Sequence, residues 1–147
     1  AFVADTARRL AEIKGLSEAD VRRITTGSAR RLFRLPGEGT PGPAVYAIRD
    51  SLYVNVTNAC DARCVFCPRT GDAWEVKGYD LKRGRDPTAE EILAGIGDPT
   101  RWREVVFCGL GEPTLRLDVV KRVAADVKAR GGRTRLRCSR QKPRRIP

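Results

Sequence analysis

The stretch that decides the fold is CDARCVFC, residues 60–67, which holds three of the five cysteines of the chain. Cys60, Cys64 and Cys67 follow the spacing C-x3-C-x2-C, and a loop this short can turn three thiolates toward one point. Thiolates are the usual protein ligands of iron–sulfur clusters. Three of them on a four-iron cluster would leave one iron free to bind a small molecule. The spacing therefore predicts an iron–sulfur centre.

A second motif, GLGEP, occupies residues 109–113 directly after a short apolar run that has the composition of a buried parallel strand. Residues 52–57, shortly before the cysteines, alternate apolar and polar residues as a strand does. Both motifs are thus expected at the carboxyl ends of strands, where α/β proteins place their sites. Gly109 and Gly111 would allow a ligand to approach the backbone, and the carboxylate of Glu112 could bind an ammonium group.

The first 35 residues predict a small helical unit. Apolar residues recur at three- and four-residue spacing, Gly15 is placed to end the first helix, and Ser17 begins a second, short one. A further helical run from Ser28 would form the last turns. Packing is the expected role of this unit.

A linker over residues 36–44, with three prolines and three glycines, is the clearest domain boundary in the sequence. The core domain is expected over residues 45–137, and a basic irregular tail over residues 138–147. Residues 68–86 predict a polar, irregular loop. Within the core we expect, in order, an edge strand over 45–48, a strand over 52–57, a capped helix over 88–97, a buried strand over 105–108, a helix over 118–130 and a strand over 133–137.

The charge of the chain is concentrated at its end. The formal net charge is +11, but the last 17 residues hold seven basic residues and no acid, and the rest has a net charge of +4. We therefore expect no nucleic-acid partner. There is no histidine, which removes the commonest zinc ligand. No run approaches the about 18 apolar residues of a membrane span, and the odd number of cysteines without a secretion signal predicts a cytoplasmic protein without a membrane partner.

The cysteine spacing, with Phe66 before the last cysteine, resembles the radical S-adenosylmethionine (radical SAM) superfamily. Residues 109–113 resemble the Gly-Gly-Glu-Pro-like motif of the same proteins. The resemblance implies that a 4Fe–4S cluster and S-adenosylmethionine are the cofactors. It assigns the cluster to Cys60, Cys64 and Cys67, the adenine contact to Phe66, and the binding of the methionyl group to Gly109, Gly111, Glu112 and Pro113.

The activity that this resemblance implies is reductive cleavage of S-adenosylmethionine to a 5′-deoxyadenosyl radical, which abstracts hydrogen from an unknown substrate. A reductant such as flavodoxin or ferredoxin would supply the electron. The fold implied is α/β, the N-terminal half of a partial (βα)6 barrel preceded by a short helical segment. We expect the chain to stop early or to leave its reading frame near Leu136, which would expose a sheet edge and make the chain unstable or inactive.

The helical segment has a resemblance of its own. Residues 7–16 and 25–33 are similar to the C-terminal end of TatD-type deoxyribonucleases, so the whole chain resembles a TatD-associated radical SAM protein. The histidines that bind metal in those nucleases have no counterpart here. The resemblance therefore does not imply nuclease activity for this chain.

Two alternative functions remain open from the residues. A non-catalytic zinc module could use the three clustered cysteines with Cys108 or Cys138, and its basic tail would bind nucleic acid. It predicts that Glu112 is dispensable. A TatD-type nuclease remnant predicts metal-dependent cleavage of DNA. Outside these alternatives, Cys108 is most simply a small apolar residue of the core.

Overall fold

The computed structural model describes residues 2–33, 35, 42–62, 64–71 and 74–138. Its contacts form two compact units. One contains two N-terminal helices with a small hairpin, and the other contains a sheet with two further helices. The predicted mixed α/β architecture with a parallel sheet is confirmed. Most of the predicted linker and nearly all of the predicted basic tail lie outside the described residues.

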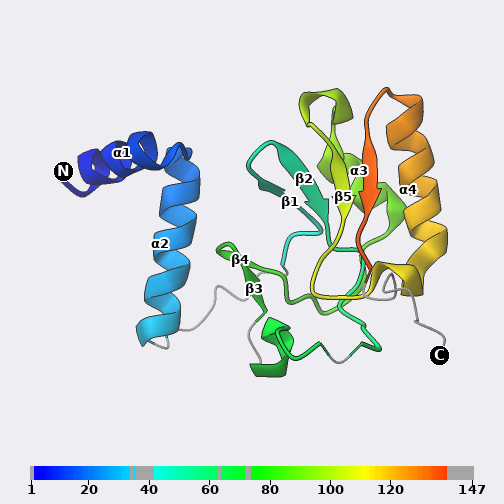
Figure 1. Cartoon of the computed structure of the whole chain (residues 1–147), viewed down its shortest axis with the longest axis horizontal. Helices are drawn as coiled ribbons and strands as arrows, with labels where there is room; N and C mark the ends of the chain where they lie inside the picture. Colours follow the sequence, from blue (N-terminus) through cyan, green and yellow to red (C-terminus); the bar gives the residue numbers. More distant parts are fainter. Residues whose placement is uncertain (1, 34, 36–41, 63, 72–73, 139–147) are drawn as a thin grey trace, which may run out of the picture. The chain divides into compact units, whose positions relative to one another are not determined.

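Four strands form the sheet of the second unit within the described residues, in the order β1-β2-β5-β6 (Figure 1). The strand β1 (Val45–Ile48) lies at the edge and runs antiparallel to β2 (Ser51–Val54). The strands β5 (Val105–Phe107) and β6 (Thr134–Leu136) then follow in parallel. A parallel connection needs a crossover, which α3 (Ala89–Ile96) and α4 (Leu117–Ala129) provide.

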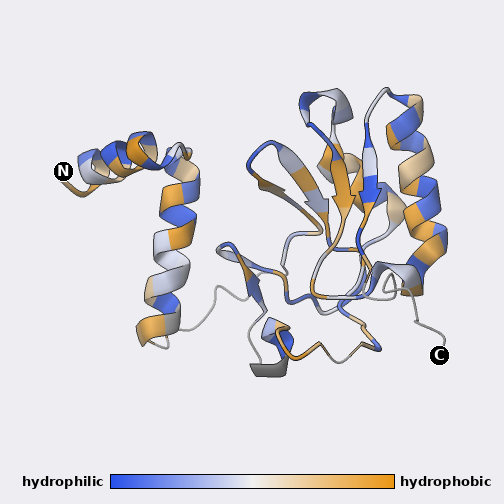
Figure 2. Cartoon of the chain, in the orientation of Figure 1, coloured by the Kyte–Doolittle hydropathy of each residue, from blue (hydrophilic) through white to orange (hydrophobic). Residues whose placement is uncertain are grey.

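The helices α3 and α4 share one hydrophobic core with the sheet. The register pairs Leu52 with Val105 and Val54 with Phe107, so these side chains lie on one face. Figure 2 shows this apolar character along β2 and β5. The buried residues of the core are Leu52, Val54, Val56, Ala89, Ile92, Ile96, Val105, Phe107, Val119, Val120, Val123 and Val127. Complete burial of such a side chain stabilises the fold by about 1.5–3 kcal/mol, so this core fixes the strands that carry the site loops.

Local signals set the ends of these two helices. Thr88 accepts a hydrogen bond from the backbone N–H of Glu91, and the Glu91 side chain accepts one from Thr88 in return, which completes the predicted capping box. Gly97 ends α3 at a φ of 60°, and Gly131 follows α4 at a φ of 81°. Both values lie in the region that glycine adopts readily.

The helical unit differs from the prediction in two ways. Helix α1 (Phe2–Lys14) ends where expected, but α2 (Glu18–Phe33) is a single helix that continues through Gly27. One interior glycine costs a helix only about 1 kcal/mol, which is too little to break it. A Cβ at this glycine would lie 3.1 Å from the carboxylate of Glu75, so a side chain there would crowd the hairpin.

No helix in the described part of the chain combines the length and the apolar character that a membrane span requires.

The second difference is the hairpin itself, in a segment for which the sequence predicted irregular structure. Strands β3 (Glu75–Val76) and β4 (Tyr79–Asp80) pair through a turn at Lys77 and Gly78, both with positive φ. Turns of this kind match the twist of paired strands. The guanidinium of Arg23 in α2 lies 3.7 Å from the centroid of the Tyr79 ring, a cation–π contact that joins the hairpin to the helices.

Candidate functional site

Two loops of the second unit lie side by side because the strands that carry them are neighbours. The cysteine loop follows β2, the GLGEP turn follows β5, and the parallel register pairs Val54 with Phe107 at the strand ends. In Figure 1 both loops lie at the lower end of the sheet. The N–H of Glu112 donates to the carbonyl oxygen of Ala59 at 2.9 Å, which bonds the turn directly to the start of the cysteine loop. The two predicted motifs therefore form one site region.

The glycines of the turn permit this close approach. A Cβ at Gly111 would lie 1.9 Å from the carbonyl oxygen of Thr57, and one at Gly109 would lie 2.0 Å from Oδ1 of Asn55. A side chain at Gly111 would clash with the backbone of the segment that follows β2, and one at Gly109 would clash with the side chain of Asn55. The structure thus gives these glycines a role in packing the two loops together. Their contact with a ligand stays a prediction.

Glu112 is held in place within the protein. Only 2% of the surface of Glu112 is exposed. Its carboxylate accepts hydrogen bonds from the N–H and the hydroxyl of Thr114, at 3.2 and 2.7 Å. It caps the 3-10 helix η3 (Pro113–Arg116), whose first residue, Pro113, is also buried. A buried carboxylate requires hydrogen-bond or cationic partners. This one is therefore ordered before any ligand binds.

The three cysteines of the loop are half-buried and form no disulfide. The N–H of Cys67 donates to the carbonyl oxygen of Cys64 at 3.0 Å, which closes a turn with Val65 and Phe66 at its centre. Phe66 is 85% exposed there. The Sγ of Cys60 lies 3.9 Å from the carbonyl oxygen of Ala62.

The donor set of this loop suits an iron–sulfur cluster in its chemistry. Three soft sulfur ligands lie within eight residues, half-buried and outside any disulfide, as cluster ligation requires. Within the described residues, however, no three cysteine, aspartate or glutamate side chains are gathered as a metal site would hold them. Arg63, inside the loop, lies outside the described residues. The assignment of the cluster to Cys60, Cys64 and Cys67 therefore stays a prediction.

Polar residues that the sequence analysis did not assign also surround the two loops. Asn55 is 1% exposed and donates to Oδ1 of Asn58 and to the carbonyl oxygen of Leu81, at 2.9 and 3.3 Å. Its own Oδ1 is buried without a hydrogen-bond partner among the described residues. Arg116 donates to the carbonyl oxygens of Val56 and Pro87, at 3.1 and 2.7 Å. No sequence signal distinguished Asn55, because a polar residue there fits the alternation of apolar and polar residues over 52–57.

Cys108, directly after β5, is half-buried and is not one of the residues of the hydrophobic core cluster. Burial raises the pKa of this thiol, and the nearby arginines Arg137 and Arg135 only partly oppose that shift. Its carbonyl oxygen accepts a hydrogen bond from the hydroxyl of Tyr46 at 3.2 Å. A thiol with a raised pKa is protonated at neutral pH and is a poor metal ligand.

The comparison with known families favours the radical SAM enzyme over the zinc module and the nuclease remnant. A family model described as the radical SAM superfamily matches residues 54–146, which include both loops. The chain belongs to the radical SAM superfamily. The match continues through the basic tail, where the sequence predicted that the family pattern would be lost. The expectation of an enzyme is confirmed at the level of this family.

Curated relatives support the same assignment. A protein of Thiobacillus denitrificans named "Probable RNA methyltransferase" is 38% identical over 94 residues, 64% of this chain and 24% of the relative. A protein of the same name from Stutzerimonas stutzeri is 37% identical over 97 residues, 64% of this chain and 25% of the relative. A third, from Azoarcus, also named as a probable RNA methyltransferase, is 33% identical over 113 residues, 75% of this chain and 30% of the relative.

The chain thus spans between 24% and 30% of the length of these relatives. No solved structure matches it significantly. The resemblance of residues 1–35 to TatD-type nucleases stays a prediction, as do the domain boundaries drawn from the sequence.

Proposed function

We propose that this chain forms the first part of a radical SAM barrel and carries its cofactor site, with RNA as the substrate of the enzyme. The observation that carries the proposal is the junction of two loops within the family match, where the turn with the buried Glu112 is bonded to the start of the cysteine loop. The partial barrel is the N-terminal half expected from the sequence, with the parallel strands β2, β5 and β6 as its first members.

In this proposal Cys60, Cys64 and Cys67 hold a 4Fe–4S cluster through their thiolates. When bound, the cluster and S-adenosylmethionine supply one-electron reductive cleavage of the sulfonium and hydrogen abstraction from the substrate. A flavodoxin or ferredoxin is the proposed reductant. Because thiolate ligands must stay reduced, the proposal places the protein in the cytoplasm.

The residues of the second loop would bind and orient the methionyl group. The carboxylate of Glu112 can accept a hydrogen bond from an ammonium group with little loss of side-chain entropy, because Thr114 already orders it. Gly109 and Gly111 keep the backbone close to β2, and Pro113 begins the 3-10 helix that fixes the direction of this turn. Phe66, which is exposed on the cysteine loop, is the proposed contact of the adenine.

RNA as the substrate rests on the names of the relatives. The charge distribution led us to expect no nucleic-acid partner, but three relatives are named as probable RNA methyltransferases. We therefore propose RNA methylation for the enzyme to which this chain corresponds.

Two assays test the proposal. The anaerobically reconstituted chain, given dithionite and S-adenosylmethionine, should release 5′-deoxyadenosine or methionine, whereas Cys64→Ala should release neither. S-Adenosylmethionine labelled in its methyl group should then transfer the label to RNA in the presence of the longer protein. Cofactor cleavage without label in RNA would refute the RNA substrate alone, and a chain that binds iron but never cleaves the cofactor would refute the enzyme proposal.

A further inference from the structure

Arg69 connects the two loops of the site through its side chain. It lies two residues after Cys67, and its Nη1 donates to the carbonyl oxygen of Leu110 at 3.0 Å, across 41 residues of sequence. Leu110 is the central residue of the GLG segment and is itself buried. A charged donor makes a stronger hydrogen bond than a neutral one. Arg69 thus ties the far end of the cysteine loop to the turn, as the bond between Glu112 and Ala59 ties its start.

The side chain of Arg69 is supported by Trp74. Its guanidinium carbon lies 5.1 Å from the centroid of the indole ring, within the range of a cation–π contact. The carbonyl oxygen of Trp74 accepts a hydrogen bond from the N–H of Leu81 at 2.7 Å, and the Leu81 side chain is completely buried. The carbonyl oxygen of Leu81 accepts from Asn55 at 3.3 Å. The support of Arg69 is therefore anchored to the end of β2, the strand that carries the cysteine loop.

This contact selects the orientation of one peptide unit. The peptide between Leu110 and Gly111 is planar, so the position of its carbonyl oxygen also fixes the direction of the Gly111 N–H. The orientation of this unit is set by ψ of Leu110 and φ of Gly111, and glycine allows the second angle many values when nothing holds it. Arg69 holds the carbonyl oxygen of Leu110 and thereby keeps the Gly111 N–H in one direction, in the turn that leads into Glu112.

We propose that Arg69 is a positioning residue, which holds the turn over residues 109–111 in the orientation that receives the methionyl group of S-adenosylmethionine. This inference rests on the proposed function for the identity of the ligand. The ordering of the turn by Arg69 is independent of that function and can be measured in the chain without cofactor.

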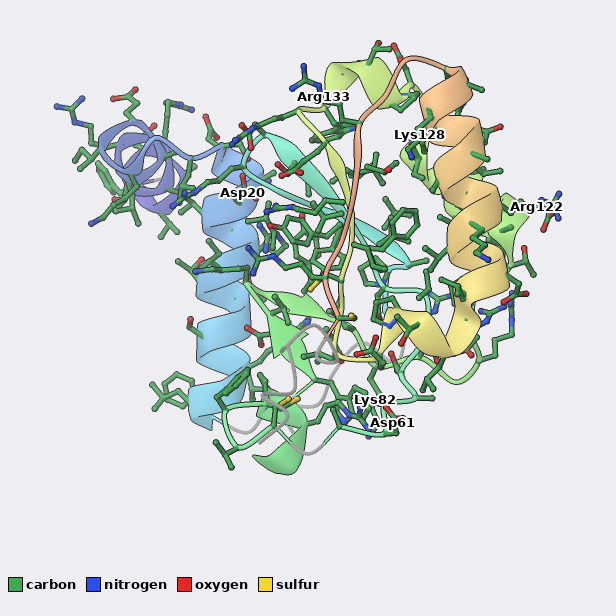
Figure 3. The ribbon with its side chains drawn as sticks, turned by 45° about the vertical axis from the view of Figure 1, so that its right-hand side comes forward. Asp20, Asp61, Lys82, Arg122, Lys128 and Arg133 are labelled. Carbon is green, nitrogen blue, oxygen red and sulfur yellow. The ribbon has the colours of Figure 1, made fainter. Side chains whose placement is uncertain are left out.

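The first test is hydrogen exchange in the cofactor-free 147-residue chain. Arg69→Met removes all donors but keeps an aliphatic side chain, and Arg69→Lys keeps one charged donor. The amides of residues 109–112 should exchange about ten-fold faster in the Met variant, and the Lys variant should restore much of the protection. Arg133→Met is the matched control, because Arg133 is exposed and lies at the other end of the sheet from Asp61 of the cysteine loop (Figure 3). Unchanged exchange in Arg69→Met would overturn the inference.

The second test measures affinity for S-adenosylmethionine in reconstituted protein, followed by the change in the EPR signal of the reduced cluster. In Arg69→Met the dissociation constant should rise about ten-fold while iron content and the signal without cofactor stay at the level of the unsubstituted chain. The Lys variant should remain within about three-fold, because it retains a donor. Equal affinity in the Met variant, or loss of the cluster in both variants, would overturn the positioning role. If the unsubstituted chain binds neither cluster nor cofactor, the proposed function fails, and hydrogen exchange still decides whether Arg69 orders the turn.

Discussion

Replacing Gly111 with alanine adds one carbon at the place where the two site loops are closest. That carbon would lie 1.9 Å from the carbonyl oxygen of Thr57 and 2.9 Å from that of Ala59, and real Cβ atoms almost never approach another atom within 3.0 Å. Both oxygens belong to the backbone, so no rotation of a side chain relieves the clash. The turn must move away from β2 and lose the hydrogen bond between the Glu112 N–H and Ala59.

The expected cost follows from these two effects. Forcing a methyl group into a packed site costs about 1–3 kcal/mol, and a lost hydrogen bond adds about 0.5–1.5 kcal/mol. Alanine also lowers the conformational entropy of the unfolded chain, which offsets the loss of stability by about 0.4–1 kcal/mol. Gly111→Ala should therefore lower the free energy of unfolding by about 0.5–4 kcal/mol.

Urea unfolding followed by circular dichroism measures this difference, with Gly84→Ala as the control. A Cβ at Gly84 meets no atom within 4 Å, and its φ lies outside the positive range. That variant should be as stable as the unsubstituted chain or slightly more so. Equal stability of the two variants would show that the loops are not packed against each other in this way, and the site geometry described above would be wrong.

Three further predictions concern the elements that support the site. Arg116→Met leaves two backbone carbonyl oxygens without their donor, so it should destabilise the chain by about 1–3 kcal/mol in the same urea assay; an unchanged midpoint would contradict the bracing role. Thr88→Ala removes the N-cap of α3 and should cost about 0.5–2 kcal/mol, with an unchanged thermal midpoint as the contrary result. Hydrogen bonds from Arg85 and from the backbone of Thr88 lower the pKa of Glu91 from 4.5 to about 2. The stabilisation from Glu91 is therefore complete above about pH 4.5 and is lost as the pH falls toward 2, and an NMR titration of Glu91 should show its pKa rising in Arg85→Ala.

The parts of the fold that the sequence predicts are those that neighbouring residues specify. Thr88 and Glu91 lie three positions apart and cap a helix without help from the rest of the chain. The sequence predicted an edge strand over 45–48 and a buried strand over 105–108, and the structure places β1 at the edge of the sheet and β5 inside it. The adjacency of the two site loops also follows, because parallel strands bring their carboxyl ends to one edge of the sheet.

The remaining features depend on contacts between distant residues. The strands of the hairpin β3–β4 are two residues each and largely polar, and the contact of Tyr79 with Arg23 supports them from another part of the chain. The short helix predicted from Ser17 and the further run predicted from Ser28 form one helix, α2, in the structure. The bond from Arg69 to Leu110 spans 41 residues, so no local pattern could predict it.

The central claim is that Cys60, Cys64 and Cys67 hold a cluster beside a turn that binds S-adenosylmethionine. EPR spectroscopy of the anaerobically reconstituted and reduced chain, with and without S-adenosylmethionine, tests it most directly. The account predicts a 4Fe–4S signal that changes when S-adenosylmethionine is added, that is absent in Cys64→Ala and that persists in Cys108→Ala. A chain that binds zinc in place of iron, or a cluster signal that does not respond to S-adenosylmethionine, would contradict the account.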